Sequence, residues 1–84
     1  MARIKQIRKR RNLPFLYKGM RLMQHSTGRF GCFVQPYGPA LNISVMWDHK
    51  FDPSVIIALE PLDPCKGITY FDKKMNIIKE FYEN

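Results

Sequence analysis

The chain has 84 residues and a formal net charge of +7 at pH 7, from 14 Lys and Arg against seven Asp and Glu. This length allows one small domain, which buries about 60 to 65% of the surface that its unfolded chain exposes. A hydrophobic content of 45%, with one Trp, four Tyr and six Phe, is enough for a packed core and excludes a wholly disordered chain.

The positive charge is concentrated at the N-terminal end. Residues 1–29 contain nine Lys and Arg and no Asp or Glu, whereas all seven acids follow residue 47. The first twelve residues carry only Ile4 and Ile7 as large aliphatics after Met1, too few for an independent helix face. We therefore expect a flexible basic arm over residues 1–12. Pro14 favours extended geometry at Leu13 and marks the start of a single domain over residues 13–84.

Targeting signals are weak in this sequence. It contains no secretory signal pattern and no apolar run of 18 residues. Cys32 and Cys65 lie in different expected elements, so we expect a cytoplasmic protein with reduced thiols and no membrane partner. An Arg-rich start without acids also occurs in mitochondrial presequences, but the lack of Ser or Thr before Ser26 disfavours that alternative.

From Tyr17 onward the spacing of the turn-forming residues is typical of a small β protein. Glycine and proline turn signals recur about every 8 to 12 residues, and short runs rich in β-branched and aromatic residues lie between them. The expected strands are 20–24, 29–35, 41–47, 55–59, 68–71 and 77–82. In the third run the odd positions are apolar, which places Trp47 on the core side of its strand.

The C-terminal segment allows two interpretations. A hairpin turning at residues 72–76 is slightly favoured. The alternative is a helix from about Lys73, in which Met75, Ile78 and Phe81 fall at helical spacing and Asp72 is the N-cap.

Residues 18–48 carry a pattern that resembles the SH3-like small barrels, including KOW-type domains. Lys-Gly opens a strand, a loop ends in Gly28-x-x-Gly31, and a later strand ends in Trp47-Asp48. The resemblance implies a mainly β fold, a small SH3-like barrel of five to six short strands, preceded by the basic arm and followed by a C-terminal hairpin or short helix. The two glycines would provide positive φ or a sharp bend.

The barrel fold does not by itself select a function, because SH3-like barrels bind nucleic acids, peptides or assembly partners. The Lys and Arg side chains of the acid-free N-terminal segment can pair with phosphates and release condensed counterions. The alternative interpretation is a solvated tail that binds nothing. An exposed aromatic at a turn tip adds a surface for base stacking. The candidate nucleic-acid-binding residues are Arg3, Lys5, Arg8, Lys9, Arg10, Arg11, Lys18, Arg21, Arg29 and Tyr37. Phe33 and Trp47 are expected in the core instead.

The sequence contains no recognisable motif for metal binding or catalysis. The candidate soft metal ligands His25, His49, Cys32 and Cys65 lack the close pairing of zinc motifs. No nucleophile with an evident base and no phosphate-binding Gly-rich loop is present. We therefore expect no enzymatic activity, no metal, no cofactor and no small-molecule substrate.

These observations lead to one principal hypothesis and two alternatives. The principal hypothesis is a non-enzymatic small barrel that binds DNA or RNA largely without sequence specificity, with its arm on the phosphates. The first alternative is a protein-interaction module, such as a small phage or mobile-element regulator or inhibitor that docks on an acidic surface of a larger host machine. The apolar run 55–59 would then be a candidate interface. The second alternative is a ribosome-associated protein whose arm enters folded RNA.

Overall fold

A computed structural model describes residues 2–48 and 59–83, which form one helix and six strands. The elements in chain order are α1 (Ala2–Arg10), β1 (Arg21–Gln24), β2 (Phe30–Tyr37), β3 (Asn42–Trp47), β4 (Leu59–Leu62), β5 (Ile68–Phe71) and β6 (Ile77–Phe81). The predicted mainly β class is confirmed.

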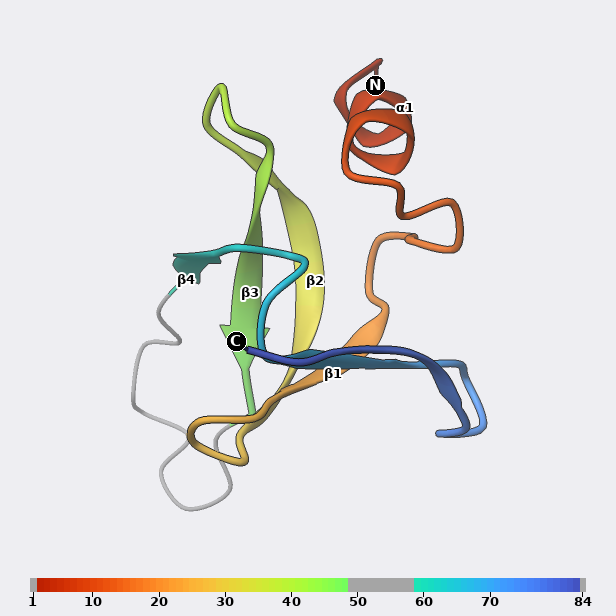
Figure 1. Cartoon of the computed structure of the whole chain (residues 1–84), viewed down its shortest axis with the longest axis vertical. Helices are drawn as coiled ribbons and strands as arrows, with labels where there is room; N and C mark the ends of the chain where they lie inside the picture. The colour runs from red at the N-terminus through yellow and green to blue at the C-terminus, as the bar shows by residue number, and fades with distance from the viewer. Residues whose placement is uncertain (1, 49–58, 84) are drawn as a thin grey trace.

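All six strands belong to one antiparallel sheet with the order β4-β3-β2-β1-β5-β6. Strands β1 to β4 form a meander, and β5 pairs with the other side of β1. In Figure 1, β2 and β3 run along the long axis of the molecule, whereas the blue C-terminal hairpin crosses its lower part. The end strands β4 and β6 do not pair with each other, so the described strands form an open sheet and not the closed barrel that was expected.

The strand predictions agree well with the observed strands. The run 68–71 is β5 to the residue, and β1, β2, β3 and β6 match their expected runs to within two residues at each end. The run expected at 55–59 lies outside the described residues except for Leu59, where β4 begins. The C-terminal hairpin is confirmed over the helix alternative, because β6 pairs with β5 along its length.

The hydrophobic core lies between one face of the sheet and the segment that leads from α1 into β1. Phe33 and Trp47 are 1% and 2% exposed, which confirms their predicted core positions. The apolar residues predicted on the core side of β3, Ile43, Val45 and Trp47, are all buried in the same cluster, but Ser44 between them is buried as well, so burial along β3 alternates only in part. The remaining core side chains are Ile7, Leu13, Leu16, Met20, Leu22, Leu41, Ile68 and Tyr70.

The two glycines singled out in the sequence serve different purposes. Gly28 has φ +71°, a left-handed conformation that favours glycine, so the expected positive φ is confirmed there. Gly31 has no positive φ. It is instead a site of close approach, because a Cβ at this position would lie 2.7 Å from the Met46 carbonyl oxygen and 2.9 Å from the Trp47 ring. Gly31 therefore allows β3 and its tryptophan to pack tightly on β2.

The N-terminal segment corrects the sequence prediction. Residues expected to form a flexible arm are helical from Ala2 to Arg10, and the helix packs on the body of the protein. The aliphatic residues are indeed too few for an isolated helix, but Ile7 is completely buried in the core cluster and Ile4 packs against it. Tertiary burial thus supplies the stability that the local sequence lacks.

Replacing Ile7 by Ala tests whether the helix is packed as described. The variant removes buried carbon atoms at a position with 0% exposure, so we expect the free energy of unfolding in urea to fall by about 2 to 4 kcal/mol. Lys5→Ala, on the exposed side of the same helix, is the matched control and should change it by less than about 0.5 kcal/mol. Equal, small effects of both substitutions would show that the helix is not docked.

The turn between β5 and β6 depends on Asp72. Its carboxylate accepts hydrogen bonds from the backbone amides of Asn76 at 2.9 Å and Lys74 at 2.8 Å, and these bonds, above all those from Asn76, hold the pKa of Asp72 below its ordinary value. Because the folded-state pKa is lowered, this carboxylate stabilises the fold at neutral pH. Its contribution is lost as the pH falls through the folded-state pKa.

We therefore expect Asp72→Asn to melt at a lower temperature than the wild type at pH 7. The difference should shrink as the pH falls from about 4, where Asp72 of the unfolded chain takes up its proton, through the lowered folded-state pKa, where the native carboxylate becomes protonated. Thermal unfolding of both proteins followed by circular dichroism between pH 7 and pH 2 measures this difference. A difference that stays constant across the series would mean that ionisation of Asp72 does not stabilise the turn.

Candidate nucleic-acid interface

Helix α1 divides its positive charges between two faces. Residues 4, 7, 8 and 11 follow helical spacing, and the side chains at these positions are buried or half-buried against the body. Lys5, Lys9 and Arg10 are exposed on the remaining surface of the helix. The cations of the N-terminal segment are therefore not equivalent, although the sequence gives no direct sign of the division.

Three arginines of the N-terminal segment are held by specific hydrogen bonds. Arg8 donates from Nε to the Leu16 carbonyl oxygen at 2.6 Å. Arg11 donates from Nη2 to Asp63 at 2.7 Å in an ion pair that connects the end of α1 to the chain after β4. Arg3 donates to the Gly38 carbonyl oxygen, in the turn between β2 and β3. These contacts fasten the helix at three points, and guanidinium groups suit them because they present several fixed donors.

The outward cations are differently placed. Within residues 2–48 and 59–83, the side chains of Lys5, Lys9, Arg10 and Lys18 make no hydrogen bond or ion pair, and all four are exposed. Three of them follow one another along α1, and Lys18 lies just before β1. Because no acid occurs before Asp48 in the sequence, these groups form a positive surface with no compensating acid from the N-terminal half of the chain.

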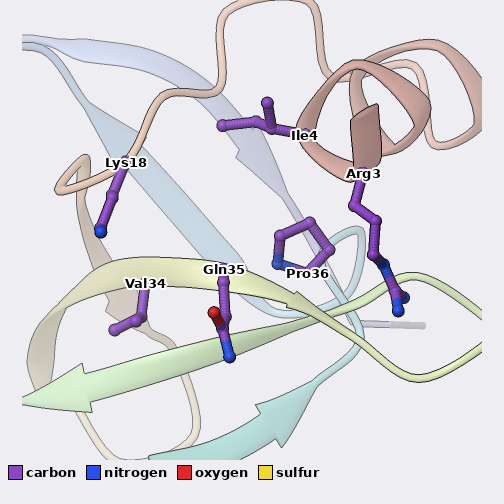
Figure 2. Close-up of a pocket in the computed structure, with 6 residues that line it drawn as sticks. All are labelled: Arg3, Ile4, Lys18, Val34, Gln35 and Pro36. Carbon is purple, nitrogen blue, oxygen red and sulfur yellow. The ribbon is translucent and has the colours of Figure 1, made fainter. Parts of the chain in front are cut away.

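A groove of about 360 Å³ lies between α1 and β2, and we call it the α1–β2 groove. Its lining residues are Arg3, Ile4, Lys18, Val34, Gln35 and Pro36. In Figure 2, Arg3 and Ile4 extend from the helix and Lys18 from the chain that approaches β1, while Pro36 lies on the helix side of β2. The groove thus has an apolar wall with a cation on either side.

The path of β2 creates this groove. Strand β1 pairs with β2 only as far as Cys32, whereas β3 continues to Tyr37, so the last residues of β2 have one edge without a partner strand among the described residues. The pairing with β3 also shifts register between Phe33 and Gln35, which leaves Val34 as a β-bulge. A bulge bends its strand and changes the direction of the following side chains, and bulges often occur beside functional sites.

The remaining predicted site residues separate into two groups. Tyr37 is 53% exposed, as expected, and it precedes the glycine whose carbonyl group accepts the Arg3 hydrogen bond, so it lies at the α1 end of β2. Arg21 and Arg29 belong to the opposite end. The Arg29 guanidinium lies 4.3 Å from the centre of the Trp47 ring. The structure therefore places Lys18 and Tyr37 near Arg3 of α1, whereas Arg21 and Arg29 lie at the other end of β2.

Arg21 is already engaged by an acid. Its two terminal nitrogens donate to the Asp48 carboxylate at 2.9 and 2.5 Å, a two-point contact that raises the pKa of the guanidinium. The same side chain donates to the Cys32 sulfur at 3.3 Å. Asp48 directly follows β3, and its carboxylate forms this ion pair across the sheet. Arg21 is therefore a structural residue first.

The possible metal ligands are scattered. His25 contacts the Thr69 hydroxyl at 2.7 Å, and Cys65 donates from its backbone amide to Asp63. No group of three His, Cys, Asp or Glu side chains able to hold a metal occurs in the part of the chain that the structure describes, and His49 lies outside it. Burial raises the pKa of the Cys65 thiol, which disfavours the reactive thiolate.

Comparisons with known proteins add no relationship. No family model matches this chain, and neither the curated proteins nor the solved structures contain a match to it. Among the described residues, no helix is both long and apolar enough to cross a membrane.

The division of the cations leads to a stability prediction. Arg8→Ala should lower the free energy of unfolding by about 1 to 3 kcal/mol, because it removes a part-buried charged donor from the Leu16 carbonyl group. Lys9→Ala, its neighbour on the exposed side, should have an effect below about 0.5 kcal/mol. Urea denaturation of the two variants measures both quantities. If the two losses were equal, the inward and outward cations would not differ in role.

Proposed function

We propose that this chain is a non-enzymatic nucleic-acid-binding protein that presents the outward face of α1 to the phosphate backbone of DNA or RNA. The observation that carries the proposal is the row of exposed cations Lys5, Lys9 and Arg10, none of which is used by a described contact of the fold. A rigid helix holds these charges at fixed spacing, so less side-chain and backbone freedom is lost on binding than with a disordered tail.

The proposed contacts position the protein but do not read a sequence. Ammonium and guanidinium groups pair with phosphate oxygens, which are the same at every nucleotide. No described element carries a set of side chains suited to a row of base edges, so the binding is expected to be largely independent of sequence. The groups that support it are fewer than the sequence suggested, because Arg8, Arg11 and Arg21 already serve the fold.

The relationship to SH3-like small barrels is part of the proposal. A four-stranded meander with β5 placed beside β1 is compatible with a small barrel of this kind, and the Gly28-x-x-Gly31 segment connects β1 to β2 as the resemblance implies. A cytoplasmic location is proposed with it, and the two free cysteines in the described residues are consistent with a reducing compartment.

A protein-interaction module is the second candidate, and the C-terminal hairpin is the observation that favours it. The hairpin exposes several large apolar side chains along an edge strand of the sheet. These residues are Met75 at 45%, Ile77 at 60%, Ile78 at 38% and Tyr82 at 66% exposure. The interface expected at residues 55–59 lies outside the described residues apart from Leu59. On this hypothesis the partner would cover the hairpin while α1 faces an acidic surface.

A salt series tests the proposed function. With three to four phosphate contacts on a duplex, the logarithm of the binding constant should fall with the logarithm of salt concentration at a slope of about −3 to −4. The triple variant Lys5→Ala, Lys9→Ala, Arg10→Ala should flatten this slope by about 3 and weaken binding to all sequences alike. Fluorescence anisotropy with a labelled mixed-sequence duplex measures the slope.

The matched control removes three positive charges elsewhere. Lys73, Lys74 and Lys79 are exposed on the C-terminal hairpin, and their replacement by Ala lowers the net charge by the same amount. This control should leave the slope almost unchanged. An equal effect of the two triple variants would show attraction by net charge alone, and no binding even at low salt would contradict the proposal.

A further inference from the structure

The α1–β2 groove has a chemistry that the phosphate contacts of the helix do not use. We propose that it binds one unstacked nucleotide of a single-stranded nucleic acid, with the base against Ile4 and Pro36 and the adjacent phosphates at Arg3 and Lys18. The inference rests on the proposed function and names the form of nucleic acid that the protein prefers. Of the residues that line this groove, only the two cations Arg3 and Lys18 belong to the nucleic-acid-binding residues expected from the sequence.

The size of the groove fits a single nucleotide. A volume of about 360 Å³ lies at the lower end of the range of small-ligand pockets, which is about 300 to 1,000 Å³. The groove is bounded by a packed helix on one side and a strand on the other, so a base pair inside a duplex cannot enter it. A base of a duplex would first have to be extruded at a cost of about a few kcal/mol, whereas a single strand presents unstacked bases directly.

The charges on either side of the groove favour an anionic chain over a neutral ligand. Arg3 lies beside the turn between β2 and β3, where its bond to the Gly38 carbonyl group at 2.5 Å fixes the guanidinium and leaves its other donors available. Lys18 is exposed and has no hydrogen bond or ion pair in the described residues. Among the residues that the structure describes, no acid lines the groove. Two cations separated by an apolar wall match a backbone whose phosphates flank each base.

The unpaired edge of β2 raises the possibility of a different occupant, an extended peptide that adds a strand. Pro36 argues against it. Proline lacks the backbone N–H, and proline on an edge is one of the features by which sheets avoid pairing with another chain. The pyrrolidine ring instead offers a flat apolar surface to a base. The groove therefore fits a nucleotide better than an added strand.

The direct test uses the full chain and an eight-nucleotide single strand of thymidines that carries 2-aminopurine at its centre and a fluorescein label at one end. Entry of the 2-aminopurine into the groove should change its fluorescence, and anisotropy reports binding separately. We expect the wild type to bind this strand about tenfold more tightly than a duplex of equal length. Ile4→Ala should abolish the 2-aminopurine signal and most of the single-strand preference, while duplex binding stays within about twofold.

Two further variants keep the outcome clear. Ile78→Ala makes the same chemical change on β6, where the side chain is 38% exposed, and should retain the signal and the preference. Lys18 is exposed and lies outside the core, so Lys18→Ala should fold normally. This variant tests the groove even if circular dichroism shows that Ile4→Ala does not fold. It should weaken single-strand binding more than duplex binding.

The results separate this inference from the proposed function. Equal binding of single strand and duplex, or groove variants that weaken both alike, would overturn the nucleotide site and leave the α1 phosphate contacts standing. Absence of binding to either form would overturn both. Binding of a poly-glutamate peptide at the groove, with no binding of the oligonucleotides, would assign the groove to an acidic protein partner instead.

Discussion

The docking of α1 on the sheet is the constraint on which the rest of this structure depends. Ile7 is completely buried in the core, although it lies on a helix of only nine residues. Hydrogen bonds from Arg8 to Leu16 and from Arg11 to Asp63 hold the same helix from its inner side. Without these contacts the helix would not be stable by itself, because isolated helices of this length are marginal in water.

Docking gives the positive charges of the segment two separate uses. The inward arginines satisfy carbonyl and carboxylate oxygens of the body, which suits their fixed, planar donor arrangement. The outward cations Lys5, Lys9 and Arg10 keep their charge in water, where it attracts a polyanion at little cost to folding. The N-terminal segment, which the sequence presents as a single basic tail, therefore holds the helix to the body with some of its cations and exposes the others for binding.

The same docking forms the α1–β2 groove. The chain that enters β1 is hydrogen-bonded to β2 as far as Phe33, and the helix lies beside the unpaired continuation of β2 without filling the space there. The bulge at Val34 and the ring of Pro36 then shape the strand side of the groove (Figure 2). Each of these features is local, but the groove exists only where helix and strand meet.

Much of the sheet was predictable because its signals are local. Alternating apolar residues set the register of β3, and the turn residues from Asp72 to Asn76 marked the C-terminal hairpin correctly. The helix was missed because its stability comes from Ile7 meeting residues of the core, a contact that a local pattern does not contain. The Arg11 pairing with Asp63 joins residues 52 positions apart, and no spacing rule predicts it.

The candidate site was only partly predictable for the same reason. Arg3, Lys18 and Tyr37 were identified from charge and exposure, and the structure places them at one end of β2. In the sequence, Ile4 belongs to the expected arm, Val34 to the expected strand 29–35, and Pro36 follows that strand directly. A signal for the groove appears only with the observed bounds of β2, which include Pro36, because proline within a sheet indicates an edge or a bulge.

The measurement that tests this account most directly is an NMR experiment on the full chain that follows the methyl groups of Ile7. The docked helix predicts nuclear Overhauser contacts from these methyls to Leu13 and Leu16, which share its core cluster, together with slow exchange of the amide protons in the second half of α1. Random-coil chemical shifts across residues 2–10, with no contacts from Ile7 to the core, would contradict the account.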